Sequence, residues 1–304
     1  MKKIQLILAA FSASLMIGLM LQSCSKNKNN NPAGPEETAT AQDNASAEHM
    51  VSDMTEMSAQ ASDGSGTLAS YREMPDAILG LSCATITTDT VNKTVIITFN
   101  GSAPCLDGRT RSGSLMLNYS ASTNGAKHYR DPGFSCTITS NNYIVDGNQV
   151  IVHNKTVTNT TAPAFNPAVT NETWSINANV TIIKPNGGRI DWACQRVKTL
   201  LNTNDPTVYH GAPTPISWNK ARVGMSGSAN GTSFNGTAFT ANITSQLIRD
   251  FGACTISGRH PLIQGILDFT PSGKPTRVID YGPGTCDLDA TVTVNGVTTH
   301  ITLP

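Results

Sequence analysis

The C-terminal three quarters of this 304-residue chain alternate between polar and apolar residues, and no other feature constrains the fold as strongly. The clearest segments are 94–99, 173–183 and 290–303, all rich in β-branched residues. Such alternation places apolar side chains on one face of a strand and polar ones on the other. In 173–183 the apolar face carries Trp174, Ile176, Ala178, Val180 and Ile182. These segments predict antiparallel strands with one face in water.

Asn-Gly and Asp-Gly dipeptides recur through the same region. Both residues tolerate the positive φ angles of a type I′ hairpin turn. Their number predicts successive hairpins, so residues 76–304 are expected to form an all-β domain, either an antiparallel hairpin meander or a β-sandwich. Related hairpin units are expected near 83–119 and 254–303. The pairs are Asn100-Gly101, Asp107-Gly108, Asn124-Gly125, Asp146-Gly147, Asn186-Gly187, Asn230-Gly231, Asn235-Gly236 and Asn295-Gly296.

The N-terminus has the parts of a cleaved export signal over residues 1–23. Lys2 and Lys3 begin it, an apolar run follows over 4–21, and the small Ser23 precedes Cys24. A transmembrane helix is the alternative, but polar residues dilute the run and a polar stretch follows it.

The sequence Leu-Gln-Ser-Cys at 21–24 resembles the lipobox of bacterial lipoproteins. The resemblance implies cleavage before Cys24 and acylation of its thiol, so that the lipid membrane is the expected partner of this residue. Ser25, rather than an aspartate, favours the outer membrane, and the basic, Asn-rich stretch that follows favours its periplasmic face over the cell surface.

Residues 24–75 are expected to be a lipidated tether with a short helix. The stretch 25–43 is rich in Asn, Pro, Ala and Thr and holds almost no large apolar residue, which predicts a flexible coil. Within 44–61 the residues Met50, Val51, Met54, Met57 and Ala61 recur at helical spacing. This stripe favours a helix packed on its own domain over one that binds a partner.

The other cysteines predict three disulfides, because an exported chain enters an oxidising compartment. Six cysteines allow 15 pairings. Two units share a cysteine that opens a strand and a later cysteine followed closely by aspartate, which favours Cys83–Cys105 and Cys254–Cys286. Cys136–Cys194 is then the remaining pair. The C-x-x-C and Cys/His patterns of metal or redox sites are absent, so no metal or cofactor is expected.

The order of the motifs FNGSAPC, DGRTRSGSLMLNY, YRDPG and SGKPTRVIDYGPGTCDLDATVTVNG resembles a group of uncharacterised lipoproteins from Bacteroidota. The resemblance spans most of residues 80–304. It implies an exported, anchored all-β protein and supplies no activity and no catalytic residues.

Function is less constrained than fold. Charged residues make up 14% of the chain and the formal net charge is 0, which argues against nucleic acid as a partner. A non-catalytic envelope protein, structural or ligand-binding, is the leading hypothesis, with a glycan or an envelope protein as partner. Its candidate ligand-binding residues are Trp218, Tyr129, Tyr143 and Tyr209, near expected loops, and the acidic pair Asp287 and Asp289.

Two alternatives remain open. Loop aromatics beside a Thr/Asn-rich face suit glycan binding, whereas Trp174 and Trp192 are in phase with apolar neighbours and are expected in the core. A glycan hydrolase would need two carboxylates at a suitable separation, drawn from Asp268, Asp280, Asp287 and Asp289.

Overall fold

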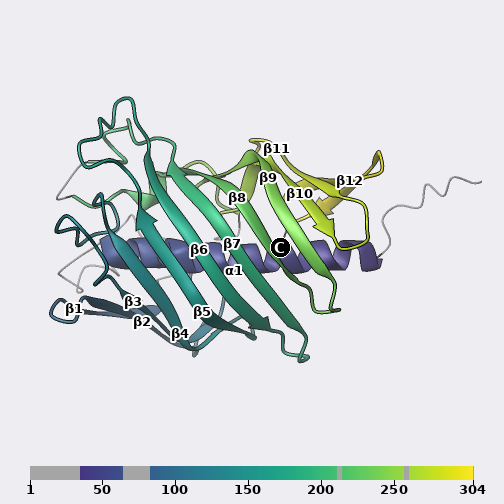
Figure 1. The fold of residues 1–304 in the computed structure, drawn as a ribbon, viewed down its shortest axis with the longest axis horizontal. Helices are drawn as coiled ribbons and strands as arrows, with labels where there is room; N and C mark the ends of the chain where they lie inside the picture. Colours follow the sequence, from purple (N-terminus) through teal and green to yellow (C-terminus); the bar gives the residue numbers. More distant parts are fainter. Residues whose placement is uncertain (1–34, 64–82, 211–213, 257–259, 304) are drawn as a thin grey trace, which may run out of the picture. The chain divides into compact units, whose positions relative to one another are not determined.

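A computed structural model describes residues 35–63, 83–210, 214–256 and 260–303. The expected signal, lipobox and first part of the tether lie outside these residues. Within them the chain forms one α-helix, a single 3-10 turn and one antiparallel sheet of 13 strands in sequence order, which confirms the hairpin meander (Figure 1).

The elements have the following bounds: α1 Pro35–Asp63, β1 Ala84–Asp89, β2 Thr94–Asn100, β3 Arg111–Asn118, β4 Ser135–Val145, β5 Asn148–Asn159, β6 Glu172–Ile183, β7 Arg189–Leu200, η3 Trp218–Lys220, β8 Arg222–Thr232, β9 Ala238–Asp250, β10 Leu262–Pro271, β11 Arg277–Pro283, β12 Asp289–Val294 and β13 Val297–Thr302.

The alternation in the sequence places the strand side chains as expected. Along β6 the five predicted inward residues are all buried. They join residues from the other strands and from α1 in one continuous core, so the sheet and the helix share a single interior. Trp174 and Trp192 lie in this core, as predicted, with 0% and 1% of their surface exposed.

The Asn-Gly and Asp-Gly pairs lie in turns, as predicted, with one exception. Asp146-Gly147 joins β4 to β5 and Asn295-Gly296 joins β12 to β13, and both residues of each pair have positive φ. Asn230-Gly231 instead lies inside β8. A Cβ atom on Gly231 would lie 2.1 Å from the Asp191 carbonyl oxygen, so here glycine permits a close approach of two strands.

The helix is longer than the sequence predicts. It begins at Pro35, inside the stretch expected to be tether, and continues to Asp63. Proline is well suited to the first position of a helix, because its fixed φ matches the helix and its missing N–H is not needed there. Ala, Glu, Gln and Met then supply strong helix propensity. The coil prediction for 35–43 is therefore wrong, because a segment of low hydrophobicity can still form a helix when its residues have strong helix propensity.

The sheet curves around α1. The neighbouring helix residues Ser52 and Asp53 contact Arg249 of β9 and Arg111 of β3, on strands that lie far apart in the sheet order. Register shifts in β3, β8 and β10 give the strands places to bend, since a β-bulge increases local twist. Figure 1 shows α1 running across the strands at a steep angle.

Two disulfides form within the described residues, and not the three expected. Cys83–Cys105 and Cys254–Cys286 are confirmed, with Cα atoms 4.8 and 5.2 Å apart. Cys136 and Cys194 are buried free thiols. They lie on β4 and β7 with two strands between them. Three strand spacings amount to about 14 Å, well beyond the reach of a disulfide. The two bonds are typical of an oxidising, extracytoplasmic compartment.

Candidate functional site: a basic sheet face around an acidic helix

Helix α1 is acidic and is enclosed by the rest of the domain. Its 29 residues include seven Asp or Glu and no Lys or Arg. From Met54 to Asp63 every residue is buried, which is nearly three helical turns without an exposed side. A helix on a protein surface buries only one stripe. This helix therefore acts as a core element although most of its side chains are polar.

The sheet and its loops meet α1 with basic side chains. Eight Lys or Arg residues contact the helix by an ion pair or a hydrogen bond, and seven of them are themselves buried. Five helix carboxylates pair with them. The shortest N–O distances are Asp43–Lys184 2.5 Å, Glu48–Arg196 2.5 Å, Asp53–Arg111 2.7 Å, Glu56–Lys198 2.6 Å and Asp63–Arg130 2.6 Å.

Strand β7 supplies two of these cations through its alternation. Arg196 and Lys198 are in phase with Trp192 and Cys194, so their side chains enter the interior. Their partners on α1 are Glu48 and Glu56. Trp192 adds a hydrogen bond from its Nε1 to the Asn44 side chain at 3.0 Å. Three side chains of β7 thus bind α1 through polar contacts.

The Lys198 ammonium lies within a cage of three aromatic rings. Its Nζ is 4.3 Å from the ring centre of Trp218, 5.4 Å from that of Tyr129 and 5.6 Å from that of Trp174. Burial lowers the pKa of Lys198, and the Glu56 carboxylate acts in the opposite direction. Cation–π attraction and one carboxylate together offset the loss of hydration of this ammonium.

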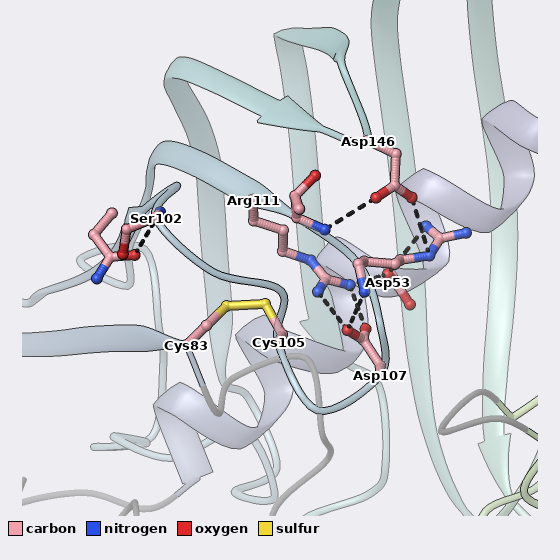
Figure 2. Close-up of a disulfide and its surroundings, with 10 residues drawn as sticks. Asp53, Cys83, Ser102, Cys105, Asp107, Arg111 and Asp146 are labelled. Carbon is pink, nitrogen blue, oxygen red and sulfur yellow. Dashed lines mark hydrogen bonds and ion pairs between the residues drawn. A yellow bond between two sulfur atoms is a disulfide. The ribbon is translucent and has the colours of Figure 1, made fainter.

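A second contact fixes α1 next to the Cys83–Cys105 disulfide. The Arg111 guanidinium bonds the Asp107 carboxylate at 2.6 Å and the Asp53 carboxylate at 2.7 Å (Figure 2). Burial alone would raise the pKa of Asp53, but His49 and the three arginines Arg111, Arg109 and Arg249 lower it to about 2. Asp107 follows Cys105 closely, so the disulfide holds the loop that presents this carboxylate.

Lys155 on β5 has no carboxylate partner among the described residues. Its Nζ donates to the Thr55 hydroxyl at 2.6 Å and to the Val51 carbonyl at 3.3 Å. Burial lowers the pKa of Lys155 to about 8. The nearby thiols of Cys136 and Cys194 have pKa values raised by burial, to about 12 and about 11. Both thiols are therefore protonated and unreactive at neutral pH.

The aromatic residues proposed for ligand binding lie elsewhere than the sequence suggests. Trp218 and Tyr129 belong to the Lys198 cage and Tyr143 contacts Phe99, and all three candidates are buried. Tyr209 is half-buried and stacks edge-on against Phe165. An aromatic platform for sugar stacking needs exposed rings, so the structure removes the support for a platform built on Trp218, Tyr129 and Tyr143.

The acidic candidates lie on the surface. The Asp287 side chain accepts a hydrogen bond from the backbone N–H of Asp289 at 3.0 Å, which is an ordinary turn contact. Asp268 and Asp280 lie diagonally on the outer face of β10 and β11. None of the four lines either of the two cavities described below. In the part of the chain that the structure describes, no three His, Cys, Asp or Glu residues form a metal-ligand group.

The basic face of the sheet was missed by sequence reasoning, although two signals point to it. Arg196 and Lys198 continue the inward phase that Trp192 and Cys194 establish on β7. The stretch 35–63 also carries acids without a single Lys or Arg. Together these patterns predict an acidic helix against an inward-facing basic strand.

Comparison with known proteins provides no relative. No protein-family model, no curated protein and no solved structure matches the chain. Among the described residues, no helix is long and apolar enough to cross a membrane.

Proposed function

We propose that this protein is an exported lipoprotein, anchored in a membrane through acylated Cys24, whose β domain is a non-catalytic envelope component with a structural or ligand-binding role. One observation supports this most directly. Five carboxylates of α1 are paired with cations of the sheet and its loops, instead of being presented to a substrate.

The position of the helix in the chain gives its ion pairs a mechanical role. Cys24 precedes Pro35 by eleven residues, so tension on a lipid anchor would reach α1 first. Five ion pairs join α1 to the sheet and its loops and would pass that tension to the whole domain. A domain held by an N-terminal anchor needs its first helix to be firmly attached to the rest of the domain, whereas an enzyme free in solution does not.

The location within the envelope extends the proposal. We place the anchor in the outer membrane, with the domain on its periplasmic face rather than on the cell surface. The two disulfides support a compartment outside the cytoplasm. The basic, Asn-rich residues after Cys24 are what favour the periplasmic side.

Lipidation is tested by comparing Cys24→Ala with the control Ser25→Ala in cells supplied with a clickable fatty acid. We expect the control to be labelled and to sediment with outer membranes, and Cys24→Ala to lose both properties. Protease treatment of intact cells then tests the face. Survival of the domain until the outer membrane is broken supports a periplasmic position, and cleavage in intact cells contradicts it. Labelled Cys24→Ala would refute the anchor.

A further inference from the structure

Arg249 on β9 is a buried cation without a carboxylate partner. Only 7% of its surface is exposed. Its Nη1 donates to the Ser52 hydroxyl at 3.2 Å, and its Nε has no hydrogen-bond acceptor. Among the described residues, no carboxylate oxygen lies within ion-pair distance of its guanidinium. Arg249 differs in this respect from Arg111, Arg130 and Arg196, which are all paired.

The carboxylates around Arg249 are bound to other cations, and Asp53, which interacts electrostatically with Arg249, pairs directly with Arg109 and Arg111. Glu48 pairs with Arg196 and Glu56 pairs with Lys198. Each of these carboxylates thus has a direct ion-pair partner, whereas Arg249 has none among the described residues. A guanidinium cannot release its proton to avoid being buried as a charge, unlike the amine of a lysine. A buried charge without a counter-ion is strongly unfavourable, so this position favours a bound anion.

A cavity borders Arg249. Its volume is about 50 Å³, and besides Arg249 its wall includes Pro261, Leu262, Tyr281, Leu288 and Leu303. A separate space of about 20 Å³ lies toward Ser52 and Glu56 and has room for about one water molecule. The larger cavity, called the Arg249 pocket below, is partly open and mostly apolar, with Arg249 and the polar groups of Glu48, His49 and His260 also in its wall.

We propose that the Arg249 pocket binds the carboxylate of a small aliphatic monocarboxylate, with the guanidinium as its anchor and the leucines around its alkyl group. A guanidinium and a carboxylate match in shape and charge and form two parallel hydrogen bonds. One guanidinium without a direct ion pair fits a monoanion rather than a phosphate dianion. The volume fits a carboxylate with a few carbon atoms, because each water-sized position takes about 10–15 Å³.

His260 does not supply a second anion-binding charge. Its Nδ1 is 2.8 Å from the Cys254 carbonyl oxygen, which can only accept a hydrogen bond, so Nδ1 carries the proton. In the neutral ring Nε2 is then an acceptor, which repels an anion rather than binding it. Recognition of the ligand charge therefore falls to Arg249.

This inference deepens the ligand-binding form of the proposed function and is independent of the lipid anchor. Butyrate binding is measured by titration calorimetry on the full wild-type chain, with the uncharged isostere butyramide as the matched ligand. We expect saturable butyrate binding and at least tenfold weaker binding of butyramide. Absent butyrate binding, or equal affinity for the two ligands, would overturn the proposal while leaving the acylation of Cys24 unaffected.

Two variants locate the site. Arg249→Gln should weaken butyrate binding at least tenfold, whereas Arg222→Gln, on the exposed edge of neighbouring β8 and outside the pocket, should leave it unchanged. If Arg249→Gln does not fold, Leu288→Trp fills the pocket while keeping the guanidinium and should also abolish binding. Unchanged affinity in Arg249→Gln or in Leu288→Trp contradicts the assignment.

Two further ligands separate the natural sources of such a carboxylate. Octanoate represents a fatty acid, and acetyl-Ala-Ala represents the C-terminus of a peptide. A preference for octanoate over butyrate would identify a fatty acid, and a preference for the peptide would identify a chain end. Both outcomes support a carboxylate site, and failure of all three carboxylates to bind excludes it.

Discussion

Removal of the Glu56 carboxylate should destabilise the domain strongly and in a pH-dependent manner. Glu56→Gln keeps the shape of the side chain but leaves the Lys198 ammonium buried without a counter-ion, since both side chains are almost fully enclosed. Breaking a buried ion pair in this way costs about 3–5 kcal/mol. We therefore expect the free energy of unfolding at pH 7 to fall by that amount.

The loss has an upper limit, because Lys198 can release its proton. Deprotonating an amine with an ordinary pKa of 10.5 at pH 7 costs about 5 kcal/mol. In the folded variant the pKa of Lys198 is then expected to fall further, because the Glu56 carboxylate no longer raises it, while in the unfolded chain it stays at the ordinary value. The unfolded state binds the extra proton over this interval, so stability rises with pH by up to about 1.4 kcal/mol per unit. The deficit of Glu56→Gln relative to wild type should therefore shrink between pH 7 and pH 9.5.

Urea unfolding followed by tryptophan fluorescence measures this directly, because Trp174 and Trp218 form part of the Lys198 cage. The double variant Glu56→Gln/Lys198→Met is the control. It removes both charges and should lie within about 2 kcal/mol of wild type, since well-packed apolar replacements of a buried pair are often neutral. A Glu56→Gln deficit below about 1 kcal/mol, or one that does not change with pH, would refute the reasoning.

Three further perturbations follow from the structure. The pKa of Lys155 is about 8 in the folded protein and 10.5 in the unfolded chain, so the unfolded chain binds more protons between these values. The free energy of unfolding of wild type should therefore rise by up to about 3 kcal/mol relative to that of Lys155→Met between pH 7 and pH 10.5, measured by urea unfolding at each pH. Loss of the Cys254–Cys286 bond in the double alanine variant should lower the unfolding free energy by about 3.7 kcal/mol, and a loss below about 1 kcal/mol would contradict the chain-entropy estimate. Gly113→Ala places a Cβ atom 2.0 Å from a backbone oxygen and should cost more than about 2 kcal/mol, whereas Gly108→Ala, also at positive φ but in open space, should cost about 1 kcal/mol, so equal losses would argue against the close approach.

The strand pattern could be predicted because it depends on local chemistry. Alternation along 173–183 places Trp174 and its neighbours in the core, and Asp146-Gly147 and Asn295-Gly296 form the expected hairpin turns. Each of these features involves residues close together in the sequence. The pairings Cys83–Cys105 and Cys254–Cys286 were accessible for a similar reason, since each bond joins cysteines separated by no more than 32 positions.

The remaining errors concern contacts that no local sequence pattern marks. Pairing Cys136 with Cys194 by elimination ignored the two strands that separate β4 from β7. Trp218 was expected at the surface because it lies in a Pro-rich connection, yet it covers Lys198, twenty residues earlier. No local pattern shows that the ammonium of Lys198 on β7 packs against Trp218 as a third aromatic ring.

The charged interface explains why such a polar segment is ordered at all. Residues 35–63 carry too few large apolar side chains to fold on hydrophobic burial alone. Each buried carboxylate of α1 must instead meet a particular cation, and a shift of the helix by one turn, about 5.4 Å, would separate the pairs. Buried ion pairs add little net stability compared with apolar contacts, but mismatched ones are heavily penalised. The five pairs therefore fix the position of α1 along the sheet more than they strengthen the fold, which is the property that the proposed lipid anchor would require of this segment.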